Sequence, residues 1–420
     1  MIIQKFNARL IFNSRKELTI AIQIKTKDGT FESSAPGGAS KGENEVLPFS
    51  KKGIDTSIQF ANTLGQKLIR EKTSFNKFQD LGKIESMFHK VDKTKRLELT
   101  GGNTLFAIEA AILKSIAASY QKEVWEFLLE QDKFKGKPQF PRPLGNCMGG
   151  GKHTKEIEKP DFQEFLILPD AKSKRIVDNH YISLQAYKEI KDTLQKQDKR
   201  FYGKITDEHA FISSFDNEKI ISLMQEVQSK IKAEFNETLD LGIDVAASSF
   251  FDKKNKLYNY NRLNGKPGTL KVDEQINYIF ELCKRYNLTY IEDPLDEEDF
   301  LGFSKLLKKV KKAGLKTLIV GDDLICTNSG RLKKAIKSKS INATIVKPNQ
   351  CGSLLETKKV IDLAKKNNIT PVISHRSGET QDPILAELAL GWQVPIIKIS
   401  VVGTDAFKTN DLIRIEKKLG

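Results

Sequence analysis

The sequence predicts an α/β protein with an N-terminal α+β capping domain at residues 1–132 and a C-terminal β/α (TIM-like) barrel at residues 133–420. Three observations carry this prediction. The chain has 420 residues, too many for one small domain. Strand patterns precede helical patterns in the first third of the chain, which is typical of α+β domains. Short apolar runs alternate with helical patterns in the remainder, which is typical of a parallel sheet.

The N-terminal domain is expected to start with strands and to continue with helices. Residues 18–25 alternate between apolar and polar side chains, and Asp28-Gly29 is a turn signal between two strands of a hairpin. The helical patterns that follow cover residues 52–71, 82–92 and 103–121. The Pro-rich, basic segment at 133–143 predicts the link to the second domain.

Six apolar runs predict strands of the barrel. These runs are Leu239–Ile243, Leu288–Ile291, Thr317–Gly321, Ala343–Val346, Pro371–Ser374 and Pro395–Ile397. Each is followed directly by a polar residue, and the six residues are Asp244, Glu292, Asp322, Lys347, His375 and Lys398. The carboxyl ends of barrel strands converge on one mouth, where active sites are built. Three acids followed by three bases therefore predict one active site at that mouth.

The residue types at this mouth indicate a hard metal ion and a basic lysine. Three carboxylates, without paired cysteines or clustered histidines, favour oxygen ligation of Mg²⁺. A lysine beside a divalent cation and a second lysine has its charged form disfavoured, so Lys347 or Lys398 could act as a base. A metal combined with a lysine base suits removal of a proton next to a carboxylate.

The composition raises the question of an acidic partner. The net charge is +15, but 57 of the 69 cationic residues are lysines and only 12 are arginines. Proteins that read nucleic acid usually depend on arginine forks, so a solvated lysine-rich surface is expected and nucleic acid is not expected as a partner. The chain shows no apolar run of membrane length and no signal-peptide pattern, and its four cysteines are widely spaced. A cytoplasmic location with reduced thiols is therefore expected.

Several segments carry a resemblance to a known family. They are Pro36–Gly42, Gly149–His153, Gln163–Phe165, Leu241–Phe251, Ile291–Pro294, Asp322–Leu324, Val346–Gln350 and Ser374–Thr380. Together they resemble the enolase family over nearly the full length of the chain, and the heptapeptide Ser374–Thr380 is the most specific of them. The resemblance implies an enolase-type barrel and a mobile loop at Pro36–Gly42. It also implies a hydro-lyase that converts 2-phospho-D-glycerate reversibly to phosphoenolpyruvate in glycolysis and gluconeogenesis.

The resemblance also implies roles for individual residues. The first Mg²⁺ would be held by Asp244, Glu292 and Asp322, and the second, which joins with substrate, by Ser40. Lys347 would be the base, and Glu208 the general acid with help from Glu164. The expected substrate-binding residues are His153, Glu164, His375, Arg376, Ser377 and Lys398. The family likeness further implies a homodimer or higher homo-oligomer.

The chain departs from the family pattern at a few positions. Lys41 replaces the usual Thr after Ser40, and His209-Ala210 replaces Gly-Gly after the general acid. Segment 399–402 replaces the usual Thr-Gly and small residues. The usual acidic residues of the N-terminal strand are absent at 20–23, which weakens the expected dimer contact. The bulk of His209 could alter the orientation of the neighbouring acid.

The sequence leaves two alternative functions open. The first is an enolase-superfamily lyase with another acid substrate, against which Arg376 and Ser377 argue because a substrate without phosphate would not need them. The second is a non-catalytic protein on the same scaffold that binds nucleic acid through its basic surface. The retained Lys347 and Lys398 argue against this second alternative.

Overall fold

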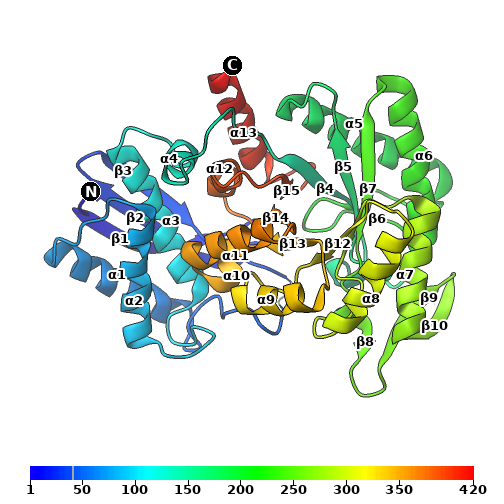
Figure 1. Cartoon of the computed structure of the whole chain (residues 1–420), viewed down its shortest axis with the longest axis horizontal. Helices are drawn as coiled ribbons and strands as arrows, with labels where there is room; N and C mark the ends of the chain where they lie inside the picture. The colour runs from blue at the N-terminus through cyan, green and yellow to red at the C-terminus, as the bar shows by residue number, and fades with distance from the viewer. Residues whose placement is uncertain (40–41) are drawn as a thin grey trace.

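A computed structural model describes residues 1–39 and 42–420, and it has the expected two-part architecture (Figure 1). The N-terminal part holds an antiparallel sheet of order β1-β2-β3, with bounds β1 (Lys5–Phe12), β2 (Leu18–Thr26) and β3 (Gly29–Ser34). Thr26 pairs with Gly29 at the turn between the last two strands, so the turn predicted at Asp28-Gly29 is confirmed.

Helices follow this sheet in the chain. They are α1 (Ile54–Arg70), η1 (Phe78–Leu81), α2 (Gly82–Val91), α3 (Gly102–Ser119) and α4 (Val124–Gln131). Two of them, α1 and α3, pack against its strands. The three predicted helices are confirmed to within two residues at each end. Helix α3 is buried around most of its circumference because it lies between β2 and β3 on one side and α10 on the other. It therefore joins the two parts of the molecule.

The second part is a closed barrel. Its strands are β4 (Arg142–Gly149), β5 (Glu164–Asp170), β7 (Thr238–Asp244), β11 (Tyr290–Glu292), β12 (Leu318–Gly321), β13 (Ala343–Val346), β14 (Thr370–Ser374) and β15 (Ile396–Lys398). They pair in the order β15-β14-β13-β12-β11-β7-β5-β4, and β15 also pairs with β4 to close the barrel. A two-residue strand, β6 (Phe211–Ile212), lies beside β4. The six predicted strands are all present.

One strand runs against the predicted parallel order. Strand β5 is antiparallel to both of its neighbours, β4 and β7. The connection from β4 to β5 contains only the short helix η2 (Gly151–His153), so the chain reverses direction without a helical crossover. The sequence pattern does not predict β4 and β5, because the alternation of strand and helix begins only after them.

Helices surround the barrel. They are α5 (Ile176–Gln197), α6 (Asn217–Phe235), α7 (Val272–Tyr286), α8 (Phe300–Lys312), α9 (Ser329–Ser338), α10 (Pro348–Cys351), α11 (Leu354–Lys366), α12 (Ile384–Gly391) and α13 (Ala406–Leu419). Figure 1 shows α10, α11 and α12 on the side that faces the N-terminal part. The short η3 (Ala247–Phe250) and the hairpin strands β8 (Phe251–Asp252), β9 (Leu257–Leu263) and β10 (Lys266–Lys271) extend from one end. Among the described residues, no helix combines the length and apolar character that crossing a membrane requires.

The barrel interior is packed with apolar side chains. A buried cluster is formed by Leu144, Leu166, Leu168, Tyr290, Val320, Ala343, Ile345, Val372 and Ile396. Strand β7 contributes Gly242 at this level, where a methyl group would lie 2.8 Å from Cβ of Tyr290. The missing side chain leaves room for the tyrosine, whose hydroxyl donates a hydrogen bond of 2.7 Å to Glu292 at the mouth. Core packing thus orients one of the predicted metal ligands.

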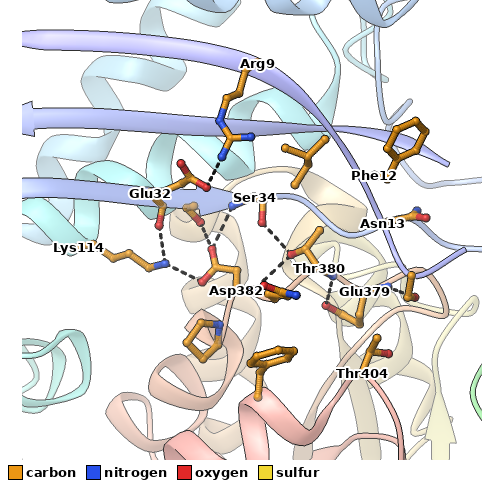
Figure 2. Close-up of a pocket in the computed structure, with 16 residues that line it drawn as sticks. Arg9, Phe12, Asn13, Glu32, Ser34, Lys114, Glu379, Thr380, Asp382 and Thr404 are labelled. Atoms are coloured by element: carbon orange, nitrogen blue, oxygen red, sulfur yellow. Dashed lines mark hydrogen bonds and ion pairs between the residues drawn. The ribbon is translucent and has the colours of Figure 1, made fainter. Parts of the chain in front are cut away.

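A cavity of about 540 Å³ lies where the two parts meet (Figure 2). Lys114 of α3 bonds the backbone oxygen of Glu32 at 2.7 Å and Asp382 at 2.6 Å. Asp382 also accepts the backbone N–H of Ser34 at 3.0 Å, and Arg9 pairs with Glu32 at 2.7 Å. The charged groups here pair with one another, so this cavity is a junction between β3, α3 and the barrel.

Candidate active site

The predicted site residues gather at the barrel mouth. One cavity is lined by Gly38, Ala39, His153, Gln163, Glu164, Glu208, Asp244, Asp322, Lys347, Ser374, His375, Arg376, Ser377 and Lys398. Glu292 lies beneath them and is fully buried. Ser40, the predicted ligand of a second metal ion, lies outside the described residues. With that exception, the structure brings every predicted site residue to this mouth.

Lys398, at the end of β15, lies among three carboxylates. Its Nζ is 2.8 Å from Glu164, 2.9 Å from Glu292 and 3.6 Å from Asp244. The three acids come from adjacent strands, because Asp244 is the register partner of both Glu164 and Glu292. Burial opposes the charge of Lys398, but Glu164 and Glu292 outweigh it and hold the pKa of Lys398 well above its usual value. The lysine is therefore a fixed positive charge inside the mouth.

Asp244 and Glu292 are buried carboxylates whose negative charges are not fully offset by Lys398. Burial raises the pKa of Asp244 well above its usual value, and the nearby Glu292 raises it further. Burial also raises the pKa of Glu292. One oxygen of Glu292, Oε1, is buried without a hydrogen-bond partner among the described residues. Oxygen donors in this condition fit a hard divalent cation such as Mg²⁺.

A second acidic group lies beside Asp322. One carboxylate oxygen from each of Asp293, Asp322 and Asp323 lies within 4.8 Å of the others. Asp293 also accepts the backbone N–H groups of Asp322 at 2.9 Å and Asp323 at 2.8 Å, which fixes the start of that loop. Two of the three predicted ligands, Asp244 and Glu292, instead share Nζ of Lys398, at 3.6 and 2.9 Å. The sequence pattern predicts no role for Asp293 or Asp323.

Lys347 follows β13 directly and pairs with Asp322. Its Nζ donates to Oδ2 of Asp322, and its backbone N–H donates to Thr327 at 2.8 Å. Burial opposes the charge of Lys347, but the nearby carboxylates, Asp322 first and then Glu292, together raise the pKa of the lysine. This direction is opposite to the one expected from the sequence, because Asp322 acts here as the counter-ion of Lys347. The amine must lose its proton before it can act as a base.

Glu208 lies at the same mouth beside a histidine and a second glutamate. Asn146 of β4 donates a hydrogen bond of 3.0 Å to Oε2 of Glu208. Nδ1 of His153 is 3.8 Å from Glu164 and 4.0 Å from Glu208. Burial opposes the charge of Glu164, but Lys398 and then His153 outweigh it and lower its pKa to about 2. Two carboxyl groups therefore meet here, and one of them is firmly ionised.

His375 has a buried acidic partner that the sequence analysis missed. Nδ1 of His375 lies 2.5 Å from Asp405, which also pairs with Lys408 at 2.7 Å. Burial opposes the charge of His375, but Asp405 outweighs it and raises the pKa of the histidine to about 9. His375 is therefore positively charged at neutral pH. Asp405 follows the divergent segment at 399–402, and no sequence signal links it to the site.

Arg376 and Ser377 lie under the loop expected to be mobile. Arg376 forms two contacts with the buried Glu45, at 3.1 and 3.2 Å, and the sequence analysis did not identify this partner. Oγ of Ser377 accepts the backbone N–H of Ala39 at 2.8 Å. A methyl group at Gly38 would lie 2.0 Å from Nη2 of Arg376, so a close approach of the loop requires glycine there.

Comparison with known proteins agrees with this geometry. The family model described as "Enolase, N-terminal domain" matches residues 3–128, and the one described as "Enolase, C-terminal TIM barrel domain" matches residues 137–420. The chain is 36% identical to a protein named Enolase from Methanosphaera stadtmanae, over 100% of this chain and 97% of that protein. It is 35% identical to an Enolase from Sulfurisphaera tokodaii, over 100% of this chain and 96% of that protein. The chain belongs to the enolase family.

Proposed function

We propose that the chain is a lyase that converts 2-phospho-D-glycerate reversibly to phosphoenolpyruvate with Mg²⁺. The observation that carries this proposal is the content of one cavity. Lys347 and Lys398 share it with buried carboxylates from adjacent strands, with Glu208, and with the pair Arg376-Ser377. These are the groups that a β-elimination of water from a phosphorylated hydroxy acid needs. The names of the similar proteins support the same reaction, and no comparison favours either alternative.

The first chemical demand is removal of a proton from the carbon next to a carboxylate. Lys347 is proposed as the base, and its Nζ forms an ion pair with Asp322. Asp244, Glu292 and Asp322 would hold one Mg²⁺, which would offset the negative charge that develops on the substrate carboxylate. Lys398 is proposed to bind that carboxylate with its fixed positive charge. Ser40 is proposed to help hold a second Mg²⁺ that enters with substrate.

The second demand is departure of hydroxide, a poor leaving group. Glu208 is proposed as the acid that protonates it, with its carboxyl oriented by Asn146. Glu164 lies close to Glu208, and like charges so close favour a proton on one of the two groups. Because Lys398 keeps Glu164 ionised, Glu164 is assigned the assisting role.

The phosphate and the rest of the substrate are proposed to meet the cationic side of the cavity. The fork of Arg376 and the hydroxyl of Ser377 would bind phosphate oxygens. The positive charge of His375 favours the same anion, and His153 completes the pocket wall. The loop segment that covers Ser377 would exclude water when it closes.

The experiment that tests this function is Mg²⁺-dependent formation of phosphoenolpyruvate by the purified chain. Wild-type protein is expected to turn over only with Mg²⁺, and Lys347→Ala to lose activity. A parallel assay with the dephosphorylated substrate separates this function from that of another superfamily lyase. Absence of turnover in folded protein, together with salt-dependent binding of RNA, would instead favour the nucleic-acid alternative.

We also propose a homo-oligomer in the cytoplasm, with the domain boundary near residue 132. Phe12, at the end of strand β1, is 70% exposed, and Leu18 beside it is 45% exposed. Phe12 lies on the edge strand of the sheet, and exposed apolar side chains at such an edge favour association. Light scattering of wild type and Phe12→Glu tests the oligomer, because the charged variant is expected to shift the mass toward that of a monomer.

A further inference from the structure

His209 occupies a strained position directly after the proposed general acid. Its φ is +63°, in the left-handed region that non-glycine residues seldom adopt. The turn that holds it is tight, because the N–H of His209 bonds the oxygen of Thr206 at 3.0 Å and the N–H of Thr206 bonds the oxygen of Ala210 at 2.8 Å. Backbone strain of this kind persists only where the surroundings compensate for it.

The surroundings of His209 hold it from two sides. The hydroxyl of Tyr187, on α5, donates a hydrogen bond of 2.5 Å to the backbone oxygen of His209. The imidazole ring lies close to Gly403, where a methyl group would lie 2.4 Å from Nδ1 and 2.5 Å from Cε1 of the ring. Nδ1 itself is buried and bonds to nothing in the described part of the chain. The ring therefore acts here through its shape and packing.

The loop that the ring touches carries a second part of the site. Gly403 lies two residues before Asp405, whose carboxylate accepts the backbone N–H of Ser400 at 2.8 Å and pairs with His375. The two family departures, at 209–210 and 399–402, thus belong to loops that contact each other. A side chain in place of the usual glycine fills the space between these loops.

We propose that His209 is a positioning residue, which holds the turn of Glu208 against the 399–405 loop and so fixes the acid relative to His375. This inference rests on the proposed function, because it assigns Glu208 the role of general acid. Among the described residues, His209 is not one of those that line the cavity of Lys347, Arg376 and Lys398. Its loss should therefore affect the chemical step and leave substrate binding largely intact.

His209→Gly is the informative variant, because glycine keeps the left-handed backbone and removes only the ring. We expect kcat to fall about tenfold, since small misplacement of a catalytic group is costly, while KM stays within about twofold. Lys339→Gly is the matched control, because Lys339 is exposed, has φ +52° and ends α9 far from the loop of the acid. It should leave kcat unchanged.

A double-mutant cycle with Gly403→Ala isolates the contact. In wild type the new methyl group also meets the ring, so it should lower kcat by more than it does in His209→Gly, where only the backbone strain remains. The strain of alanine at φ +94° is present in both backgrounds and cancels. Wild-type kcat in His209→Gly, or additive effects of the two substitutions, would overturn the proposal.

Hydrogen exchange keeps the test independent of the proposed reaction. In His209→Gly, exchange should rise in peptides that cover 204–212 and 399–405 and stay unchanged elsewhere. Unchanged exchange in both loops would overturn the positioning role even if the enzyme were active. Lack of turnover in wild type would instead refute the proposed function, and the exchange result would still decide whether the ring holds the two loops together.

Discussion

Nζ of Lys398 lies 2.9 Å from Oε2 of Glu292, and neither side chain is exposed beyond 4%. The pair is the centre of a buried cluster in which two further carboxylates face the same amine. Removal of one partner from a buried pair leaves an uncompensated charge. The energetics of this cluster therefore link the stability of the barrel mouth to its chemistry.

Lys398→Met should destabilise the protein and abolish activity. Loss of the amine leaves three buried acids without their counter-ion, so the free energy of unfolding should fall by about 3 kcal/mol. Urea unfolding in the absence of Mg²⁺ measures this change. Lys339→Met, at an exposed helix end, serves as control and should change stability by less than about 0.5 kcal/mol. Stability of Lys398→Met equal to that of wild type would show that the cluster is not held by this charge.

Mg²⁺ should stabilise wild type through Asp244. Binding to the folded state alone adds about 2.7 kcal/mol at a concentration of 100 times Kd, and thermal unfolding with and without EDTA detects it. Asp244→Asn should lose most of this gain because a neutral amide is a poorer ligand than a carboxylate. Asp252→Asn, in the hairpin outside the cavity, should keep it. Equal stabilisation of both variants would exclude Asp244 as a ligand.

Asp405→Asn should lower the pKa of His375 and weaken the fold in a defined pH range. The pKa of His375 is raised from 6.5 to about 9, so its contribution to stability is complete below 6.5 and disappears as the pH rises through 9. The pKa of Asp405 is depressed, so its contribution is complete above 3.8 and declines at lower pH. The substitution should therefore lower the free energy of unfolding most between pH 3.8 and pH 6.5, by about 3 kcal/mol.

NMR titration of His375 and unfolding at several pH values check this prediction together. Asp411→Asn is a suitable control, because Asp411 pairs with the half-exposed Arg414 on the surface of α13. A His375 pKa that stays near 9 in Asp405→Asn would contradict the assignment of Asp405 as its partner.

Gly38→Ala should weaken substrate binding. The methyl group would displace the guanidinium of Arg376, which is proposed to bind phosphate, and should raise KM by about tenfold. Steady-state kinetics measure KM, and Gly136→Ala, in an open part of the linker, is the control. Because Gly136 has φ +112°, the control also shows whether backbone strain from replacing a glycine changes KM by itself. An unchanged KM in Gly38→Ala would show that the loop does not approach Arg376 closely in solution.

The barrel could be predicted because most of its strands have a local sequence pattern. Each of the six predicted runs is a short apolar segment between helical patterns, and the residue after it falls at the mouth by topology alone. Strands β4 and β5 could not be found in this way, because a direct reversal without a helix joins them.

The partners of the site residues were beyond sequence reasoning. Asp405, Asn146 and Glu45 contact the site residues across 30, 62 and 331 positions of the chain, and only the folded backbone brings them together. The raised pKa of Lys347 has the same origin, because it depends on the contact with Asp322. Residue types at strand ends predict which groups meet, whereas their pairing depends on side-chain packing.

The most direct test of the proposed reaction is exchange of the C2 proton of 2-phosphoglycerate with solvent deuterium, followed by NMR together with phosphoenolpyruvate formation. In the presence of Mg²⁺, wild type should show both, Glu208→Gln should keep exchange but lose product, and Lys347→Ala should lose both. Exchange that persists in Lys347→Ala, or its absence in wild type, would contradict the account.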